Sequence, residues 1–353
     1  MKKASVLLLA LSFIANICFA QEVQKPRIAV IATGGTIAGV GATSTGPGYT
    51  SAQVAVSSLL ENMPQLYSIA DIIPIQLSQV ASQNMDFGVL MRLAWAIDSL
   101  FTYGNVDGVV VTHGSDTIEE SAYFLNLTVH HSNPVVMVGS MRPSTSLSPD
   151  GPMNLYNAIS LASNPQAYAK GVMVMFNDYI LSADDVTKTN TVNVDALECP
   201  NYGPLGVMRD GKPLFFRSPL TRHTYISEFD IKTLPESLPL VDIVSSYVGA
   251  DDAVIRTLVA LGDKGIVISG VGHGNATSAI INYASQAVKG PNPIPVVRAS
   301  RVLRGGVTTD LEDSFEGEIP SWYKSPQKSR ILLMLALTKT NDIAKITEYF
   351  IEY

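Results

Sequence analysis

Short apolar runs alternate with amphipathic segments along most of this chain, and the alternation limits the choice of fold class. The runs contain many β-branched residues and are shorter than typical helices, so we interpret them as strands buried on both faces of a parallel sheet. Strands that alternate with helices indicate βαβ units and an α/β fold. The strands predicted in the first part of the chain are Ile28–Ala32, Ile72–Leu77, Gly108–Thr112, Pro134–Gly139 and Gly171–Phe176.

The segments between these strands carry helical signals. Asp86–Phe101 places its apolar residues on one helical face. Asp116 and Glu119 have the spacing of a capping box, which predicts a helix over Ile118–His130. A further helix is predicted to begin at Asp150.

The composition of the sequence changes near residue 217. Arg217–Pro239 is polar, contains several prolines and has no sustained period, which indicates an interdomain linker. We therefore predict an N-terminal α/β domain over residues 21–216, a linker over 217–239 and a smaller C-terminal α/β domain over 240–353. The strands predicted in the second domain are Leu240–Tyr247, Gly265–Gly270 and Ile294–Ser300, and its helices are Asp252–Leu261, Thr277–Val288 and Pro326–Thr338.

The first twenty residues have the composition of a secretory signal peptide. Lys2 and Lys3 precede the apolar stretch Val6–Ile17, and small residues surround the expected cleavage site after Ala20. The stretch is shorter than the roughly 20 residues of a membrane span. We expect an exported protein without a membrane anchor after cleavage, with the periplasm as its compartment.

Charge and cysteine content exclude some functions. The net charge is −7, and loss of Lys2 and Lys3 takes it to −9, which argues against nucleic acid and anionic membranes as partners. Cys199 is the single cysteine after signal cleavage, so an intrachain disulfide is excluded. The five histidines have no metal-ligand spacing, and we expect neither a metal nor a cofactor.

The first predicted strand ends in the glycine turn Thr33–Thr36. Ligands of open α/β sheets bind at the carboxyl ends of the strands, and two glycines allow close approach to the backbone. The phosphate-loop and dinucleotide motifs are absent. Two interpretations stay open from the residues alone: Thr36 is a nucleophile presented by the turn, or the stretch is a plain tight turn.

A glycine-rich stretch with Tyr49 follows this turn. Its composition is that of a surface loop. The loop could be a simple connection, or it could be a lid that carries Tyr49 to a site near Thr36.

Three more groups of polar residues follow predicted strands. Ser115 and Asp116 come after Gly108–Thr112, where Asp116 alone would serve as a helix cap and His113 is expected to be structural. Lys188 lies in a polar segment; it is either a solvated charge or a base beside a hydroxyl. Ser82 and Gln83 follow the second strand and offer a hydroxyl and an amide to a polar ligand.

Several segments together resemble the signature sequences of bacterial type II L-asparaginases. The similarity extends over nearly all of the chain after residue 20. It implies a two-domain asparaginase-like fold, in which a larger flavodoxin-like domain precedes a smaller α/β domain. The segments that carry it are 32–39, 112–117, 135–143, 150–158, 185–190, 201–206 and 325–328.

The resemblance implies an activity and roles for particular residues. Thr36 would attack the side-chain amide of L-asparagine, and Tyr49 would help to remove its proton. Ser115, Asp116 and Lys188 match a second catalytic cluster. Water would then hydrolyse the threonine acyl-enzyme to aspartate, after ammonia has left.

Substrate binding and assembly are implied in the same way. Ser82, Gln83 and Asp116 would hold the α-carboxylate and α-amino groups. Family members are homotetramers whose sites are completed by a partner subunit, from which Asn275 and a glutamate would reach across. Glu312 is the best match for that glutamate, with Asp310 and Asp313 as the alternatives.

The chain departs from the family pattern at three places. Position 115 is serine where threonine is usual, and His273 stands where many relatives have asparagine. The segment around Glu312 is shorter than in relatives. Because the resemblance places the partner's glutamate in this segment, the difference bears on whether the enzyme prefers asparagine or glutamine as substrate.

L-Asparagine hydrolysis is therefore the expected function. A broad glutaminase-asparaginase is the near alternative, and a periplasmic amino-acid binding protein is the alternative from another class. A nucleotide-binding module is disfavoured by the missing phosphate motifs.

Overall fold

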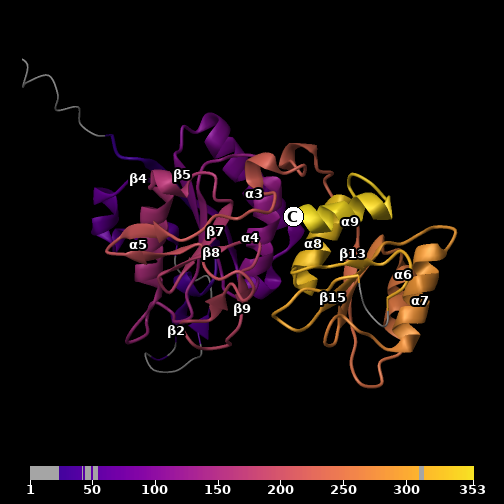
Figure 1. Ribbon diagram of the computed structural model, residues 1–353. Helices are drawn as coiled ribbons and strands as arrows, with labels where there is room; N and C mark the ends of the chain where they lie inside the picture. Colours follow the sequence, from indigo (N-terminus) through magenta and orange to yellow (C-terminus); the bar gives the residue numbers. More distant parts are fainter. Residues whose placement is uncertain (1–23, 42, 44–48, 51–54, 310–313) are drawn as a thin grey trace, which may run out of the picture.

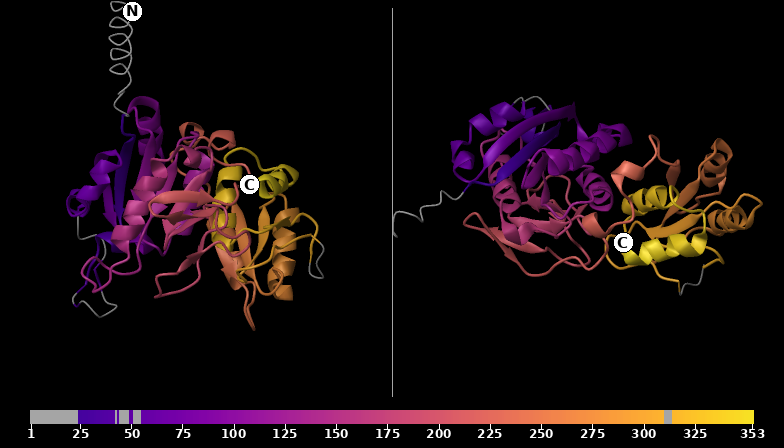
Figure 2. Two further views of the ribbon diagram at one scale, coloured as in Figure 1. Left: turned by 60° about the vertical axis from the view of Figure 1, so that its left-hand side comes forward. Right: turned by 90° about the horizontal axis from the view of Figure 1, so that it is seen from above.

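The computed structural model describes residues 24–41, 43, 49, 50, 55–309 and 314–353. Within them the chain forms two α/β units, one around an eight-stranded sheet and one around a four-stranded sheet (Figure 1). The larger unit contains the N-terminal half, and the smaller one contains the C-terminal part. Two further views show the two sheets at opposite ends of the molecule, with the yellow C-terminal helices on the side of the small sheet that faces the larger unit (Figure 2).

The large sheet has the strand order β12-β11-β8-β7-β6-β5-β1-β4. Five of these strands are parallel neighbours, and they correspond to the five predicted strands. If these five strands are numbered in chain order, they lie side by side in the sheet as 2-1-3-4-5. This is the flavodoxin-like doubly wound order. The five are β1 (Arg27–Gly34), β4 (Asp71–Val80), β5 (Gly108–Thr112), β6 (Val135–Val138) and β7 (Val172–Phe176).

Burial on both faces explains why these strands are apolar throughout. Ile28 and Val30 of β1 pack on one side of the sheet, and Ala29 and Ile31 pack on the other. One face is covered by α3 (Phe87–Tyr103) and α4 (Ile118–Thr128), whereas the other is covered by α2 (Val56–Glu61) and α5 (Gly151–Ala162). Both layers bury their apolar stripes against the sheet, the usual solution for α/β folds.

Three antiparallel strands extend this sheet at one edge, and none of them was predicted. They are β8 (Tyr179–Ser182), β11 (Gly206–Arg209) and β12 (Lys212–Phe215). Each is only four residues long, so periodicity gives little signal. Two short hairpins lie outside the large sheet: β2 (Val40–Gly41) with β3 (Tyr49–Thr50), and β9 (Thr187–Lys188) with β10 (Leu197–Glu198). Short 3-10 turns occupy Thr36–Ala38, Pro64–Ser68, Ser82–Asn84 and Pro165–Ala167.

The small sheet is parallel and confirms the three strands predicted for it. Its order is β13 (Val241–Ser245), β14 (Gly265–Gly270), β15 (Val296–Ser300) and β16 (Ile319–Pro320). The helices α6 (Ala253–Leu261) and α7 (Ser278–Lys289) cover one face, and α8 (Pro326–Ala336) covers the other. The last helix, α9 (Ile343–Glu352), and strand β16 were not predicted. Helix α8 packs against α4, so the two units share one apolar core.

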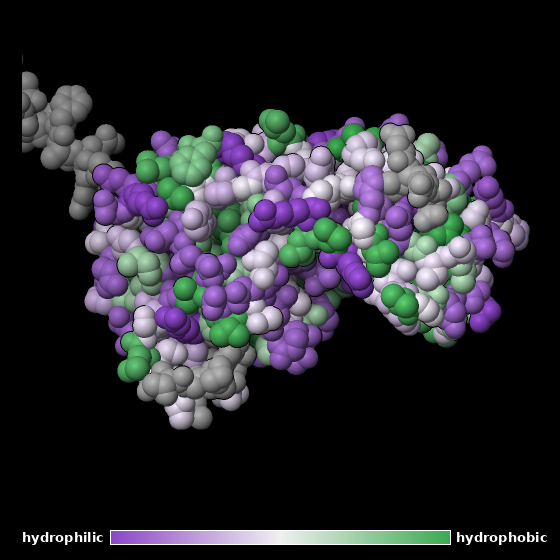
Figure 3. All heavy atoms as spheres, turned by 60° about the horizontal axis from the view of Figure 1, so that its bottom comes forward, coloured by the Kyte–Doolittle hydropathy of each residue, from purple (hydrophilic) through white to green (hydrophobic). Residues whose placement is uncertain are grey.

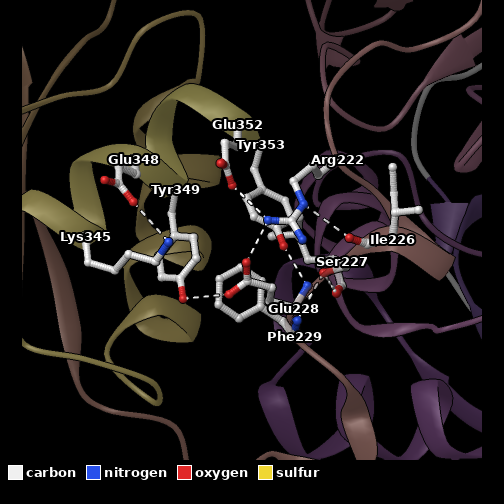
Figure 4. Close-up of polar contacts among 11 residues, drawn as sticks. Arg222, Ile226, Ser227, Glu228, Phe229, Lys345, Glu348, Tyr349, Glu352 and Tyr353 are labelled. Carbon is white, nitrogen blue, oxygen red and sulfur yellow. Dashed lines mark hydrogen bonds and ion pairs between the residues drawn. The ribbon is translucent and has the colours of Figure 1, made fainter.

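Residues 217–239 connect the two units and are packed between them. The segment contains short turns at Thr224–Ile226 and Ile231–Thr233, and its Phe229 and Ile231 are fully buried. Figure 4 shows how polar contacts tie it to α9: Arg222 pairs with Glu228 at 2.7 Å and with Glu352 at 2.8 Å. These contacts, together with the buried aromatic side chains, fix the path of the connection.

The face at the bottom of Figure 1 carries β2 and β9. Its hydrophobic residues form small separate groups among polar ones (Figure 3). Among the described helices, none has the length and apolar character needed to cross a membrane.

Candidate active site

The site lies where the strand order of the large sheet reverses. Strands β1 and β5 are neighbours in the sheet. From β1 the chain continues to β4 on one side, and from β5 it continues to β6 on the other side. Crevices at such switch points are the usual ligand sites of doubly wound sheets. The turn after β1 carries Thr36, and the turn after β5 carries Ser115 and Asp116.

Glycines allow the turns at this point to touch. A Cβ atom on Gly35 would lie 2.4 Å from the backbone nitrogen of Gly114, and Gly35 has a φ of +89°. A Cβ atom on Gly114 would lie 2.5 Å from the hydroxyl oxygen of Ser82. Only glycine fits such a close approach, so these two positions bring the ends of β1, β4 and β5 together.

The two threonines of the first turn have different environments. Thr33 donates a hydrogen bond from Oγ1 to the carbonyl of Thr112 at 2.8 Å and thereby links β1 to β5. This contact gives Thr33 a structural role. Thr36 begins a short 3-10 turn directly after Gly35 and is only 3% exposed.

Ser115, Asp116 and Lys188 form a compact polar cluster beside this turn. Lys188 donates from Nζ to Ser115 Oγ at 2.9 Å and to Asp116 Oδ1 at 2.6 Å. The Ser115 residue is 4% exposed, whereas the Asp116 side chain is 53% exposed. An ion pair with this exposure contributes little to stability, so its value lies in orienting the three groups.

The capping box predicted at Asp116 and Glu119 is wrong. Helix α4 begins at Ile118 after Thr117, and Thr117 makes no side-chain capping bond. The Asp116 carboxylate turns toward Lys188, and Thr117 Oγ1 donates to the carbonyl of Ser82 at 2.8 Å. The side-chain cation of Lys188 thus occupies the carboxylate in place of the backbone N–H groups of a helix cap.

Sequence reasoning assigned no role to Met141, which touches the cluster. Ser115 donates from Oγ to the Met141 sulfur at 3.3 Å. Asp150 holds this segment because its carboxylate accepts from the backbone nitrogens of Met141 and Arg142. The segment 135–143 carried the family resemblance, but a methionine alone does not signal an acceptor for a serine hydroxyl.

His113 is structural in its contacts. It is fully buried, its Nδ1 donates to the carbonyl of Gly114 at 2.8 Å, and its Nε2 accepts from Ser121 Oγ at 2.9 Å. Burial lowers the pKa of His113 to about 4. The imidazole is therefore neutral near pH 7, with both ring nitrogens already engaged.

Ser82 and Gln83 occupy the 3-10 turn after β4. Ser82 is buried and lies against Gly114, whereas Gln83 is exposed. Ser82 is thus within the group of converging turns, and Gln83 lies at its surface.

Of the other predicted site residues, only Asn275 is described together with its side chain. Asn275 closes the turn after β14 through two backbone hydrogen bonds with Val271, each 2.8 Å long. The side chain of Tyr49 lies outside the described residues, and its backbone pairs with Gly41 in the β2–β3 hairpin. Glu312, Asp310 and Asp313 also lie outside the described residues.

A cavity, a buried cysteine and the distribution of possible metal ligands also bear on the chemistry of the region. A cavity of about 310 Å³ opens beside Asp116 and Lys188 and is lined on the C-terminal side by Arg301 and Tyr323. Cys199 is buried, and burial raises the pKa of its thiol to about 12, so it is not poised as a nucleophile. In the part of the chain that the structure describes, no three His, Cys, Asp or Glu side chains are grouped to hold a metal ion.

Fold and site together define a doubly wound α/β protein with a hydroxyl–lysine–carboxylate cluster at the switch point of its larger sheet. Comparison with known families gives two matches. Residues 27–221 match the family described as "Asparaginase, N-terminal", and residues 240–350 match "Glutaminase/Asparaginase C-terminal domain". The chain belongs to the asparaginase family.

Individual relatives agree with this assignment. "L-asparaginase 2" of Escherichia coli (strain K12) is 45% identical over 330 residues, which cover 93% of each chain. The "Probable L-asparaginase periplasmic" of Haemophilus influenzae is 41% identical over 99% of this chain and 100% of its own. The crystal structure of a "Probable Cytoplasmic L-asparaginase" from Campylobacter jejuni superposes with a TM-score of 0.90 at 45% identity and covers 93% of this chain and 100% of that one.

Proposed function

We propose that this protein hydrolyses the side-chain amide of L-asparagine to L-aspartate and ammonia. Its family membership and its similarity to proteins named L-asparaginase support the reaction. The observation that carries the proposal is the Ser115–Lys188–Asp116 cluster beside the glycine turn of Thr36. This set supplies hydroxyls, an amine and a carboxylate for a small zwitterionic amide.

The proposed mechanism is acyl transfer through Thr36. Its Oγ1 bonds to the amide carbon while its hydroxyl proton passes by way of the Tyr49 hydroxyl to the amide nitrogen. The C–N bond then breaks, and the nitrogen, which now carries three hydrogens, departs as ammonia. Water adds to the resulting ester and releases aspartate and the free threonine. Backbone N–H groups of the glycine turns would stabilise the oxyanion.

The second cluster would activate a hydroxyl and hold the substrate. Lys188 donates to Ser115 in the resting site, and loss of its proton would allow it to act as a base there. A carboxylate has two acceptor oxygens, so Asp116 can take the substrate ammonium while it holds Lys188. Ser82 would bind the α-carboxylate, with Gln83 beside it.

The proposed assembly is a homotetramer in which each site needs a partner subunit. Asn275 and Glu312 would be supplied by the partner's C-terminal domain, with Asp310 and Asp313 as alternatives to Glu312. The acidic residue that contacts the α-amino group would influence the preference for asparagine over glutamine. We also retain the division into a signal peptide (1–20), an N-terminal domain (21–216), a linker (217–239) and a C-terminal domain (240–353).

The proposed location is the periplasm. The charged start, short apolar stretch and small residues of positions 1–20 support export. Among relatives, one is named periplasmic and one solved structure is named cytoplasmic. Cleavage after Ala20 in protein recovered from the periplasmic fraction of cells, measured by mass spectrometry of the intact chain, tests the location.

Ammonia release by the purified protein tests the reaction. We expect release from L-asparagine and a loss of at least about 10²-fold in the Thr36→Ala variant, because the nucleophile is removed. Comparing kcat/KM on asparagine and glutamine distinguishes an asparaginase from a broad glutaminase-asparaginase. Amino-acid binding without ammonia release would instead favour a periplasmic binding protein.

A further inference from the structure

A second lysine, Lys328, reaches the segment that carries Lys188. It lies in the first turn of α8 and is 2% exposed. Its Nζ donates a hydrogen bond to the carbonyl of Val186, which is 142 residues away in the sequence and two residues before Lys188. A buried ammonium without such a partner would strongly destabilise the fold. The bond therefore holds the Lys328 side chain and the Val186 carbonyl together.

The hairpin that presents Lys188 is too small to hold itself in place. Its strands β9 and β10 pair over only two residues each. An isolated two-stranded hairpin is at best marginally stable in water, and this one is far shorter than most. The position of Lys188 therefore depends on contacts from outside the hairpin.

Some of those contacts come from residues beyond position 300. Besides the Lys328 bond, the backbone nitrogen of Gly305 donates to Asn201 Oδ1 at 3.0 Å. Asn201 in turn donates from Nδ2 to the Asp185 carboxylate at 2.8 Å, directly before Val186. The hairpin is thus bonded to the C-terminal unit as well as to the large sheet, where the Val186 backbone nitrogen donates to the carbonyl of Ser182.

We propose that Lys328 is a positioning residue for Lys188. By holding the Val186 carbonyl, it sets the approach of Lys188 to Ser115 and Asp116 across the boundary between the two units. The inference rests on the proposed amidase function, in which Lys188 acts on Ser115. A displacement of about 1 Å in such a group costs up to about 10²-fold in rate.

Lys324 provides a matched control. It also donates from Nζ to a backbone carbonyl, that of Phe350 at 2.7 Å, but this bond stays inside the C-terminal unit. Replacing Lys324 by methionine removes a comparable contact without touching the hairpin. It reports what the loss of a part-buried lysine–carbonyl bond does to the fold alone.

The experiment measures kcat and KM for ammonia release by the full chain, together with the melting temperature. For Lys328→Met we expect kcat to fall about 10- to 100-fold with KM within about threefold, because the groups proposed to bind substrate stay in place. We expect Lys328→Arg, which keeps the cation and a donor, to recover most of kcat. Lys324→Met should lose thermal stability while keeping the wild-type kcat.

The outcomes separate the inference from the proposed function. If the wild type is active and Lys328→Met keeps its kcat, or loses kcat no more than Lys324→Met at equal stability, the positioning role is wrong and the amidase function stands. If the wild type releases no ammonia, both the amidase function and the positioning role of Lys328 are wrong. Should Lys328→Met fail to fold, Lys328→Gln gives the same test, because its neutral and shorter side chain cannot reach the carbonyl.

Discussion

At the scale of single residues, Lys188 shows how one side chain depends on its partners. A lysine in a polar segment is ordinarily a solvated charge. Here it joins a nearly buried serine to an aspartate whose side chain is half exposed. The neighbouring histidine, His113, is excluded from proton transfer because both of its ring nitrogens are bonded.

Replacing Lys188 by methionine tests the role of the cluster. We expect turnover of asparagine to fall about 10²- to 10⁴-fold, the range for loss of a general acid–base group. The melting temperature should change little, since a partly exposed ion pair contributes little to stability. Near-normal turnover in this variant would remove the lysine from the mechanism.

The burial of His113 predicts that the free energy of unfolding depends on pH. Its pKa is about 4 in the folded chain and about 6.5 in the unfolded chain, so the unfolded state binds more protons between these values. The stability that this group contributes is present above pH 6.5 and is lost as the pH falls toward 4, by about 3 kcal/mol in total.

The measurement is urea unfolding of the wild type and of His113→Gln at pH 7 and pH 4. We expect the variant to be less stable at pH 7 but to lose less free energy of unfolding on acidification. The difference between the two proteins isolates His113 from other titrating groups. Parallel losses in the two proteins would contradict the prediction.

At the scale of elements, glycine turns at the ends of β1 and β5 bring the site together. The strands determine that the turns share one edge, and the missing Cβ atoms allow them to touch. The hairpin β9–β10 adds the lysine from outside the sheet. The turn after β1, the turn after β5 and the hairpin thus each supply one part of the candidate site.

Gly35→Ala tests the close approach of the two turns. The new Cβ would lie 2.4 Å from Gly114 N, and the φ of +89° is itself strained for alanine. The backbone strain alone costs about 1–3 kcal/mol, and the clash adds to it. We expect a large loss in the free energy of unfolding measured in urea, together with loss of activity because Thr36 is displaced.

Gly249→Ala is the matched control for this substitution. Gly249 has a similar φ of +79°, but a Cβ there would meet no other atom within 4 Å. We expect a loss of only about 1–2 kcal/mol, from the left-handed backbone alone. Equal losses at the two positions would show that the turns can move apart without cost.

At the scale of the whole molecule, the connection between the two units is part of the core. Phe229 packs on Tyr349 and Tyr353 with ring centroids 5.1 Å apart in both pairs. Arg222 adds two ion pairs at the same place (Figure 4). The polar, proline-containing composition of residues 217–239 indicates a connection but not how firmly it is packed.

Phe229→Ala is expected to loosen this junction. Removing a fully buried phenylalanine costs about 3–5 kcal/mol, and the loss falls on the contact between the units. Calorimetry should show a lower melting temperature and a broadened or double transition. Phe216→Ala, at a side chain that is 66% exposed, should change the free energy of unfolding by less than about 0.5 kcal/mol.

Local sequence patterns were enough to predict the eight main parallel strands, because strands buried on both faces are continuous apolar runs bounded by turn residues. The same patterns predicted most of the longer helices, which carry an apolar stripe. They missed β8, β11 and β12, whose four residues are too few for a period, and they missed α9.

The sequence by itself determined which side chains follow the strand ends, and hence that Thr36, Ser82, Ser115 and Asp116 would share one edge of the sheet. Only the tertiary structure decided which of them meet. Asp116 pairs with Lys188 and does not cap α4, Met141 accepts from Ser115, and Lys328 holds Val186. These contacts join residues distant in the chain, and local periodicity carries no information about the distance between two side chains that separate elements bring together.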